Sequence, residues 1–263
     1  MDYRRLGDSG LKVSEIGLGC NNFGMRIDQA ATDAVVNAAI EHGITLFDTA
    51  DVYGGQGKSE EMLGNVLTGG KRDQIVLATK FAMPMGQSPE MRGGSRRYVM
   101  NAVEASLRRL QTDYIDLYQM HRPDTDTPIE ETLSALDDLV TQGKVRYIGN
   151  SNFTGWMIAD ADWTARNEHM NRFVSAQNNY SLLERRVEHE VNPACERFGL
   201  GMLPFFPLAS GLLTGKYTRG EAPPEGTRLA AWGPRGAAAL NDKNFDRLEK
   251  LRSEERRVGK ECW

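Results

Sequence analysis

The chain has 263 residues, with 36 Asp and Glu against 32 Lys and Arg, and a net charge of −4 at pH 7. This length suits one α/β barrel of roughly 250 residues, and the acidic balance argues against a nucleic-acid partner. No apolar run is long enough for a membrane span, and the polar start is unlike a signal peptide, so we expect no membrane partner and a cytoplasmic location. The spacing of Cys20, Cys195 and Cys262 predicts neither a metal site nor a disulfide framework.

Short apolar runs alternate with segments of helical period, which is typical of βα units around a parallel sheet. Residues 3–15 predict a hairpin that precedes the barrel. The seven predicted barrel strands are Ile16–Gly19, Ile44–Asp48, Gln74–Lys80, Tyr114–His121 and residues 145–152, 172–180 and 201–208. The predicted helices are residues 28–42, 59–67, 95–110, 130–142 and 187–198, with a last helix from about Asn241. Residues 220–236, with three prolines and four glycines, predict a long surface loop.

The predicted fold class is therefore α/β, a (β/α)₈ TIM barrel with an N-terminal β-hairpin. Only seven units are visible, whereas closing the sheet needs an eighth strand and helix. We expect residues 1–251 to form one barrel domain that is incomplete at its C-terminus. The segment 252–263 breaks the apolar periodicity before it and resembles the translation of a sequencing-adapter read, so we expect a non-native tail.

Titratable residues fall at the carboxyl ends of three predicted strands. Asp48, Lys80 and His121 end the second, third and fourth strands, and Tyr53 follows Asp48 by five residues. In a parallel barrel these ends face one mouth, where barrel enzymes assemble their active sites. Each residue alone could serve the fold instead, as a helix cap, a snorkelling lysine, a loop aromatic or a rim histidine. Together they predict a catalytic site.

These four side chains suit the protonation of a carbonyl oxygen. A tyrosine with an ordinary pKa of about 10 is a poor acid at neutral pH, and we expect the ammonium of Lys80 to lower the pKa of Tyr53 into a useful range. Asp48 would compensate the charge of Lys80, and His121 would orient and polarise the carbonyl.

Four motifs recur in an order that points to one family. They are FDTADVYG at Phe47–Gly54, ATKF at Ala78–Phe81, DLYQMHRPD at Asp116–Asp124 and GNSNF at Gly149–Phe153. With these motifs the chain resembles the aldo-keto reductases from Tyr3 to about Leu251. The resemblance implies a (β/α)₈ barrel with bound NADPH, no metal, and a tetrad of Asp48, Tyr53, Lys80 and His121.

The resemblance also implies where the cofactor would bind. Phe205 stands where many relatives have a stacking tyrosine, and its ring still offers a π-face. Lys216 and Gly211 resemble the segment that wraps the pyrophosphate. The implied cofactor contacts are Gly19, Cys20, Asn21 and Asp48, then Ser151, Asn152 and Gln177 at the nicotinamide, and Phe205, Leu208, Ser210, Gly211 and Lys216.

The expected activity is hydride transfer from NADPH to a small-molecule aldehyde or ketone. The residues 83–97 and 220–236, which would wall the substrate pocket, do not specify which carbonyl compound. Two alternatives stay open: a regulatory subunit associated with a channel, as some relatives are, and a barrel enzyme without hydride chemistry, such as an isomerase. The sequence does not indicate an oligomeric state.

Overall fold

The computed structural model describes residues 1–261, with side chains described as far as Ser253. The chain divides into two compact units, of which unit 1 comprises Met1–Asn178 and His189–Leu203, and unit 2 comprises Asn179–Glu188 and Pro204–Trp263. No helix among residues 1–261 is long and apolar enough to cross a lipid bilayer.

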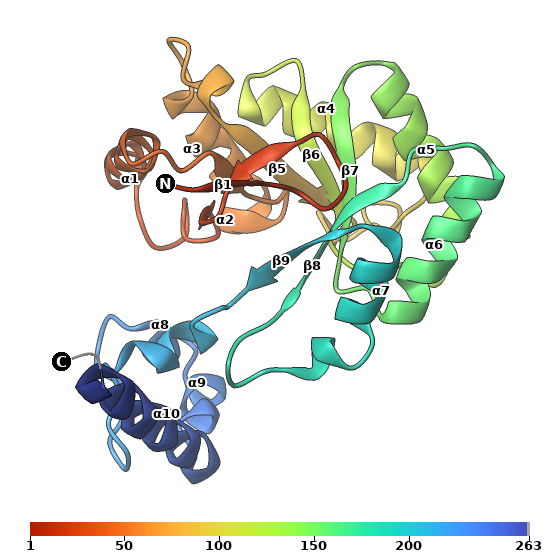
Figure 1. Cartoon of the computed structure of the whole chain (residues 1–263). Coiled ribbons are helices and arrows are strands. Elements are labelled where there is room, and N and C mark those ends of the chain that lie inside the picture. Colours follow the sequence, from red (N-terminus) through yellow and green to blue (C-terminus); the bar gives the residue numbers. More distant parts are fainter. Residues whose placement is uncertain (262–263) are drawn as a thin grey trace. The chain divides into compact units, whose positions relative to one another are not determined.

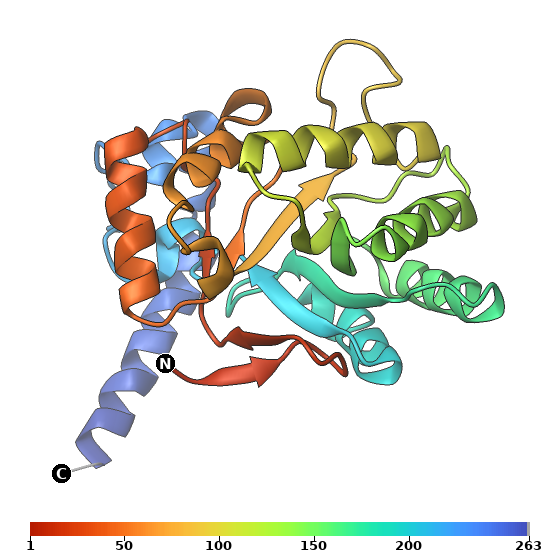
Figure 2. The ribbon, with the colours of Figure 1, turned by 90° about the horizontal axis from the view of Figure 1, so that it is seen from above.

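The central element is a seven-stranded sheet whose strands follow chain order, from β3 to β9. Neighbours from β3 to β8 pair in parallel, and the sheet curls, with helices on its outer side (Figure 2). The strands are β3 Gly17–Gly19, β4 Leu46–Asp48, β5 Val76–Phe81, β6 Ile115–Met120, β7 Val145–Ser151, β8 Phe173–Asn179 and β9 Gly201–Phe205. The prediction of seven strands in a barrel-like α/β fold is confirmed.

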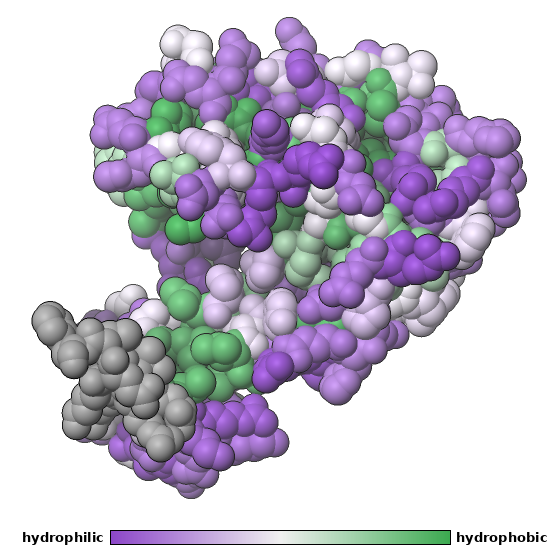
Figure 3. Space-filling model, in the orientation of Figure 1, coloured by the Kyte–Doolittle hydropathy of each residue, from purple (hydrophilic) through white to green (hydrophobic). Residues whose placement is uncertain are grey.

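Helices connect successive strands of the sheet and cover it. Their bounds are α1 Gln29–Glu41, α2 Tyr53–Gln56, α3 Lys58–Val66, α4 Arg96–Leu110, α5 Ile129–Thr141, α6 Gly155–Asn167 and α7 Val191–Phe198, with 3₁₀ turns at Arg72–Gln74 and Arg186–Glu188. Side-chain caps explain two of the starts, because Asp28 accepts from the N–H of Ala31 and Ser95 from that of Tyr98. The sequence pattern had not indicated α6. On the face that Figure 3 shows, the surface of unit 1 is mostly hydrophilic, with apolar residues between the polar ones.

An N-terminal hairpin, β1 Tyr3–Arg5 and β2 Lys12–Ser14, forms as predicted, and it packs against the interior of the sheet. Leu6 and Val13 of the hairpin segment form one buried cluster with Leu46, Ala78 and Leu117, which lie on three neighbouring strands. This cluster fills the sheet interior with apolar side chains on the side away from the strands' carboxyl ends. The interior of the sheet is therefore apolar around this cluster.

Unit 2 contains the 3₁₀ turn η3 Ala209–Thr214 and the helices α8 Arg228–Ala231, α9 Pro234–Ala239 and α10 Asp242–Glu261 (Figure 1). Its core consists of Leu212, Tyr217, Leu229, Phe245 and Leu248. Arg219 forms ion pairs with three acidic residues of α10, at 2.8 Å from Asp242, 2.6 Å from Asp246 and 3.1 Å from Glu249. These pairs hold the segment before the helices against α10.

The prediction that residues 220–236 form a surface loop is wrong, because α8 and the start of α9 lie within them. Leu229 is fully buried in the core of unit 2, and the burial of this apolar side chain stabilises the helix that carries it. Thr227 caps α8 by accepting from the N–H of Ala230, and Pro234 stands at the first position of α9. The predicted last helix is confirmed, and it continues through Gly259 to Glu261.

The predicted non-native tail is only partly within the described chain. Residues 252–261 form the last turns of α10, and residues 262 and 263 lie outside the described residues. The expectation that residues 252–263 are non-native stays a prediction, as does the domain boundary at residue 251.

A substitution at Gly7 tests how closely the hairpin packs against the sheet. Its φ of +57° is left-handed, and a Cβ there would lie 2.3 Å from the carbonyl oxygen of Gly199. Gly143 has a φ of +75° with open space around its Cβ position, so it provides a matched control. We expect Gly143→Ala to cost about 1 kcal/mol for its backbone conformation and Gly7→Ala to cost about twice that or more, because it adds a steric clash. Thermal or urea unfolding measures the stability that each variant loses. Equal losses for the two variants would contradict close packing of the hairpin against the sheet at Gly7.

Candidate active site

Three strands and one helix start place the four predicted catalytic residues. Asp48 ends β4, Lys80 lies near the end of β5, His121 follows directly after β6, and Tyr53 opens α2. The backbone holds these ends together, since the N–H of His121 donates to the carbonyl of Phe81 at 2.9 Å. All four residues belong to unit 1.

Asp48 and Lys80 form a buried ion pair at the centre of this group. The Nζ of Lys80 donates to Oδ2 of Asp48 at 2.6 Å and to the carbonyl of Thr49 at 2.9 Å. The Lys80 side chain is 0% exposed and that of Asp48 is 20% exposed. Burial lowers the pKa of Lys80, but the nearby Asp48 and Tyr53 outweigh burial and the net direction is upward. The ammonium is therefore charged at neutral pH.

Two side-chain amides complete the surroundings of Asp48. Gln119 of β6 and Gln177 of β8 each donate from Nε2 to Oδ1 of Asp48, at 3.1 Å and 3.0 Å. The carboxylate thus accepts from one ammonium and two amides, which offsets much of the cost of burying its charge. Gln119 was missed from the sequence; its only signal was a polar residue near the end of a mostly apolar strand. Gln177 was expected at the nicotinamide, and here its Nε2 contacts Asp48.

Tyr53 lies between Lys80 and His121. The Nζ of Lys80 is 5.1 Å from the centroid of the Tyr53 ring, and the rings of Tyr53 and His121 meet edge to face at 5.6 Å. Burial raises the pKa of Tyr53, and the charge of Lys80 offsets only part of that rise. The expectation that Lys80 brings this pKa below its ordinary value is therefore wrong, because removal of the phenol from water outweighs the ammonium.

His121 is a neutral imidazole over the physiological range. Burial lowers its pKa to about 3, and the charges of Lys80 and Arg122 act in the same direction. Its Nδ1 is buried and has no hydrogen-bond partner among the described residues. A neutral imidazole carries one N–H and can donate one hydrogen bond to a bound molecule.

The residues expected at the nicotinamide lie side by side at the ends of β7 and β8. The backbone N–H of Asn152 and the hydroxyl of Ser151 both donate to the carbonyl of Gln177, at 3.0 Å and 2.9 Å. The Nδ2 of Asn152 donates to the carbonyl of His121 at 2.9 Å. Asn152 has a left-handed φ of +61°, which costs a non-glycine residue free energy and is frequent at functional sites.

The three cofactor contacts expected at the end of β3 differ in how exposed they are. No atom lies within 4 Å of the position that a Cβ on Gly19 would take, so that backbone borders open space. The side chain of Cys20 is fully buried, which leaves only its backbone for a ligand, and burial raises the pKa of its thiol. Asn21 is half-buried.

The other expected cofactor residues lie in unit 2. Ser210 and Gly211 have left-handed φ values of +59° and +95° within η3, and the Nζ of Lys216 is 3.1 Å from the position of a Cβ on Gly211. Lys216 forms no ion pair within the described chain. Phe205 meets Phe206 edge to face at 5.3 Å, and Leu208 is exposed. Within unit 2, Gly211 and Lys216 thus form a cationic turn suited to an anionic group.

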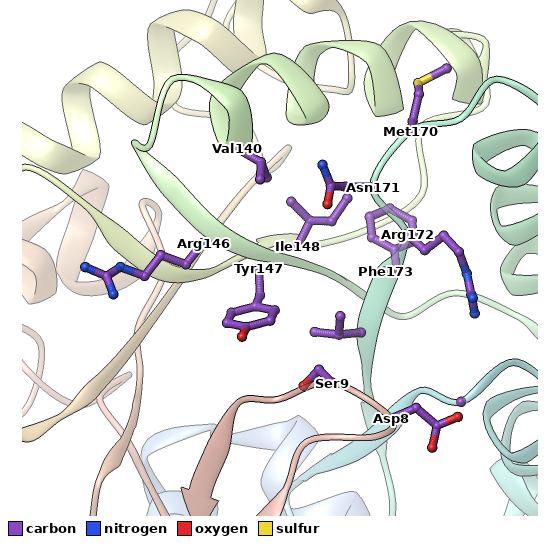
Figure 4. A pocket seen from close by; sticks show the side chains of 12 residues that line it. Asp8, Ser9, Val140, Arg146, Tyr147, Ile148, Met170, Asn171, Arg172 and Phe173 are labelled. Atoms are coloured by element: carbon purple, nitrogen blue, oxygen red, sulfur yellow. The ribbon is translucent and has the colours of Figure 1, made fainter.

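A cavity of about 520 Å³ borders His121 and Asn152; its other lining residues are Met83, Arg122, Pro123, Thr125 and Met157. A second cavity, of about 400 Å³, lies beside the starts of β7 and β8 (Figure 4). Its two arginines are already engaged, because Arg172 binds Asp162 at 2.5 Å and Arg146 lies over the Tyr114 ring at 3.9 Å. The first cavity is therefore the candidate substrate site.

A buried acidic network behind the Tyr53 turn was missed from the sequence. Asp51 is 1% exposed; its N–H donates to the carbonyl of Lys80 at 3.1 Å, and its Oδ2 accepts from the hydroxyl of Tyr98 at 3.3 Å. Glu60 is also fully buried, and its Oε2 lies 2.6 Å from Arg109. Burial and the charge of Glu60 raise the pKa of Asp51 to about 8, against the opposing charge of Arg109. Asp51 is thus mainly a neutral acid at pH 7.

Comparison with known proteins identifies the family. The profile of the Aldo/keto reductase family matches residues 15–260. The chain is 41% identical over 260 residues to Uncharacterized oxidoreductase YrpG of Bacillus subtilis (strain 168), covering 95% of this chain and 77% of that protein. It is 37% identical to Probable aldo-keto reductase 1 of Glycine max, over 94% of this chain and 71% of that protein.

A third relative is named as a channel subunit and not as an oxidoreductase. It is Probable voltage-gated potassium channel subunit beta of Oryza sativa subsp. japonica, 37% identical over 85% of this chain and 69% of that protein. The fold, the site geometry and these matches agree: the chain belongs to the aldo/keto reductase family. Membership implies an oxidoreductase that reduces carbonyl compounds with a nicotinamide cofactor.

The Asp51 network makes stability depend on pH. The pKa of Asp51 is raised to about 8 in the folded chain, whereas an unfolded aspartate has a pKa of about 3.9. Between these values the folded state keeps a proton that the unfolded state loses, so stability falls as pH rises through this window. We expect Asp51→Asn to flatten the fall between pH 5 and 8, whereas the exposed Asp113→Asn keeps it. Urea unfolding at each pH measures this, and parallel profiles for wild type and Asp51→Asn would contradict it.

Proposed function

We propose that this chain is an NADPH-dependent reductase of small aldehydes or ketones, with Tyr53 as general acid. The observation that carries the proposal is the convergence of Tyr53, His121 and the buried Asp48–Lys80 pair, of which His121 lines the candidate substrate cavity. The phenol lies 5.1 Å, centroid to Nζ, from an ammonium that burial and Asp48 hold in place. A positioned proton donor beside a fixed positive charge suits a reaction that forms an alkoxide.

The raised pKa of Tyr53 is compatible with this role. It keeps the phenol protonated at neutral pH, so the acid form is fully populated before reaction. When the phenolic proton moves to the carbonyl oxygen, the charge of Lys80 stabilises the phenolate that remains. Lys80 thus acts mainly after proton transfer begins, where a stabilising interaction accelerates the chemical step.

His121 would orient the substrate carbonyl. Its imidazole is neutral, because its pKa is lowered to about 3, and it can donate one N–H to the carbonyl oxygen while it lies edge-on to Tyr53. The hydrogen bonds to the carbonyl oxygen would then come from two neutral donors, the phenol and the imidazole. Neither donor adds a permanent charge, so the transition state is favoured over the ground state.

The residues present fit a nicotinamide cofactor, which when bound supplies the hydride. The open space above Gly19 and the left-handed Asn152 in unit 1 support the nicotinamide end. Taken by itself, unit 2 offers a turn at Gly211 beside Lys216, which forms no ion pair within the described chain, and this turn suits a diphosphate. Ser151, Asn152 and Gln177 would hold the carboxamide, with Gln177 using the amide oxygen that its bond to Asp48 leaves available.

A regulatory role is the second candidate, favoured by the rice relative named as a potassium channel subunit beta. The discriminating experiment mixes the purified chain with NADPH and a panel of aldehydes and follows the loss of NADPH absorbance. Turnover with several aldehydes supports the reductase, whereas tight NADPH binding without turnover supports the regulatory subunit. If the purified chain binds no NADPH, both the reductase and the regulatory proposal are contradicted.

The role of Tyr53 makes a separate prediction. Tyr53→Phe keeps the ring beside Lys80 but removes the transferable proton, so kcat should fall by about 10²-fold or more, with the Kd for NADPH within about twofold of wild type. Tyr3→Phe is the control, because it loses one exposed hydroxyl in the hairpin. Steady-state kinetics and fluorescence titration measure the two quantities. Retention of most of the kcat by Tyr53→Phe would show that another group is the acid.

A further inference from the structure

The candidate substrate cavity has a sharply divided lining. Met83, Pro123 and Met157 provide apolar surface, and the thioether side chains of the two methionines adapt to different shapes. The polar part consists of His121, Arg122, Thr125 and Asn152. An occupant of this cavity of about 520 Å³ therefore needs both an apolar body and a polar end.

Arg122 carries the one formal charge among those lining residues at neutral pH. It follows His121 directly, and because β6 ends at Met120, the two side chains line one cavity instead of pointing to opposite faces as in a strand. The guanidinium is exposed and has no ion-pair partner among the described residues. Its charge reaches the site, since it contributes to the lowered pKa of His121.

Neighbouring acidic groups leave this charge uncompensated. Asp124, two residues on, is engaged elsewhere: its Oδ2 accepts from the N–H of Gly94 at 2.8 Å and from the hydroxyl of Thr127 at 2.7 Å. Asp48 is engaged by Lys80. The cavity therefore presents a guanidinium that has no ion-pair partner within the described part of the chain, and its planar fork matches a carboxylate or phosphate.

We propose that Arg122 selects carbonyl substrates that carry an anionic group on an apolar body, such as carboxylated aromatic or aliphatic aldehydes. The assignment rests on the proposed carbonyl reduction and adds a substrate class to it. The carbonyl would lie at Tyr53 and His121, the body against the methionines, and the anion at Arg122. Because Arg122 is exposed, its pairing with the anion should weaken as salt is added.

The test compares two aldehydes of similar shape, 4-carboxybenzaldehyde and its methyl ester, which differ in charge. For wild type we expect kcat/KM to be about fivefold higher for the carboxylate, the upper range for a partly exposed ion pair. In Arg122→Gln this ratio should fall to about one. The matched control is Arg108→Gln, which removes an exposed guanidinium from the outer helix α4 and should keep the wild-type ratio.

Calorimetric titration with 4-(hydroxymethyl)benzoate, the alcohol product, gives a readout that does not need turnover. Binding that is weakened by Arg122→Gln and not by Arg108→Gln supports the proposal. Equal kcat/KM for the two aldehydes in wild type, or a preference that survives Arg122→Gln, would overturn it. If neither aldehyde is reduced, the proposed reductase function fails for this pair, and the titration alone decides whether Arg122 binds the anion.

Discussion

The buried ion pair between Asp48 and Lys80 is the constraint on which the site depends. A lysine that is 0% exposed can stay charged only if its partner is fixed and close, and the 2.6 Å contact meets that requirement. Removing either partner would leave an uncompensated buried charge, at a cost of about 3–5 kcal/mol. Gln119 and Gln177 both donate to the other oxygen of Asp48. Side chains from the four strands β4, β5, β6 and β8 thus meet at one carboxylate.

This arrangement divides the sheet interior into an apolar part and a polar part. The hairpin residues Leu6 and Val13 close the first part with a hydrophobic cluster, which supplies stability without demanding precise polar geometry. The carboxyl ends of β4 and β5 hold Asp48 and Lys80, and a cavity borders His121 directly after β6. Stability and chemistry thus depend on different ends of the same strands, as the general organisation of parallel barrels suggests.

Much of this arrangement was predictable, because strand spacing and residue type encode it directly. The seven strands, the hairpin and the convergence of Asp48, Tyr53, Lys80 and His121 follow from apolar runs that end in polar residues. The direction of the Tyr53 pKa did not follow, since the sequence shows the neighbouring charge but not the depth of burial that outweighs it. The Asp51 network was missed for the same reason: its members lie on separate elements, and only packing brings them together.

The most direct test of the account is the ionisation of Tyr53 followed by NMR in protein with ¹³Cζ-labelled tyrosine, assigned with Tyr53→Phe. The account predicts that the Tyr53 signal stays largely that of the phenol at pH 10, where an ordinary tyrosine is about half ionised. In Lys80→Met the signal should resist ionisation further, because burial remains and the compensating charge is gone. A Tyr53 that ionises well below pH 10, or one whose ionisation is unchanged in Lys80→Met, would contradict the claim that Lys80 offsets the burial of this phenol.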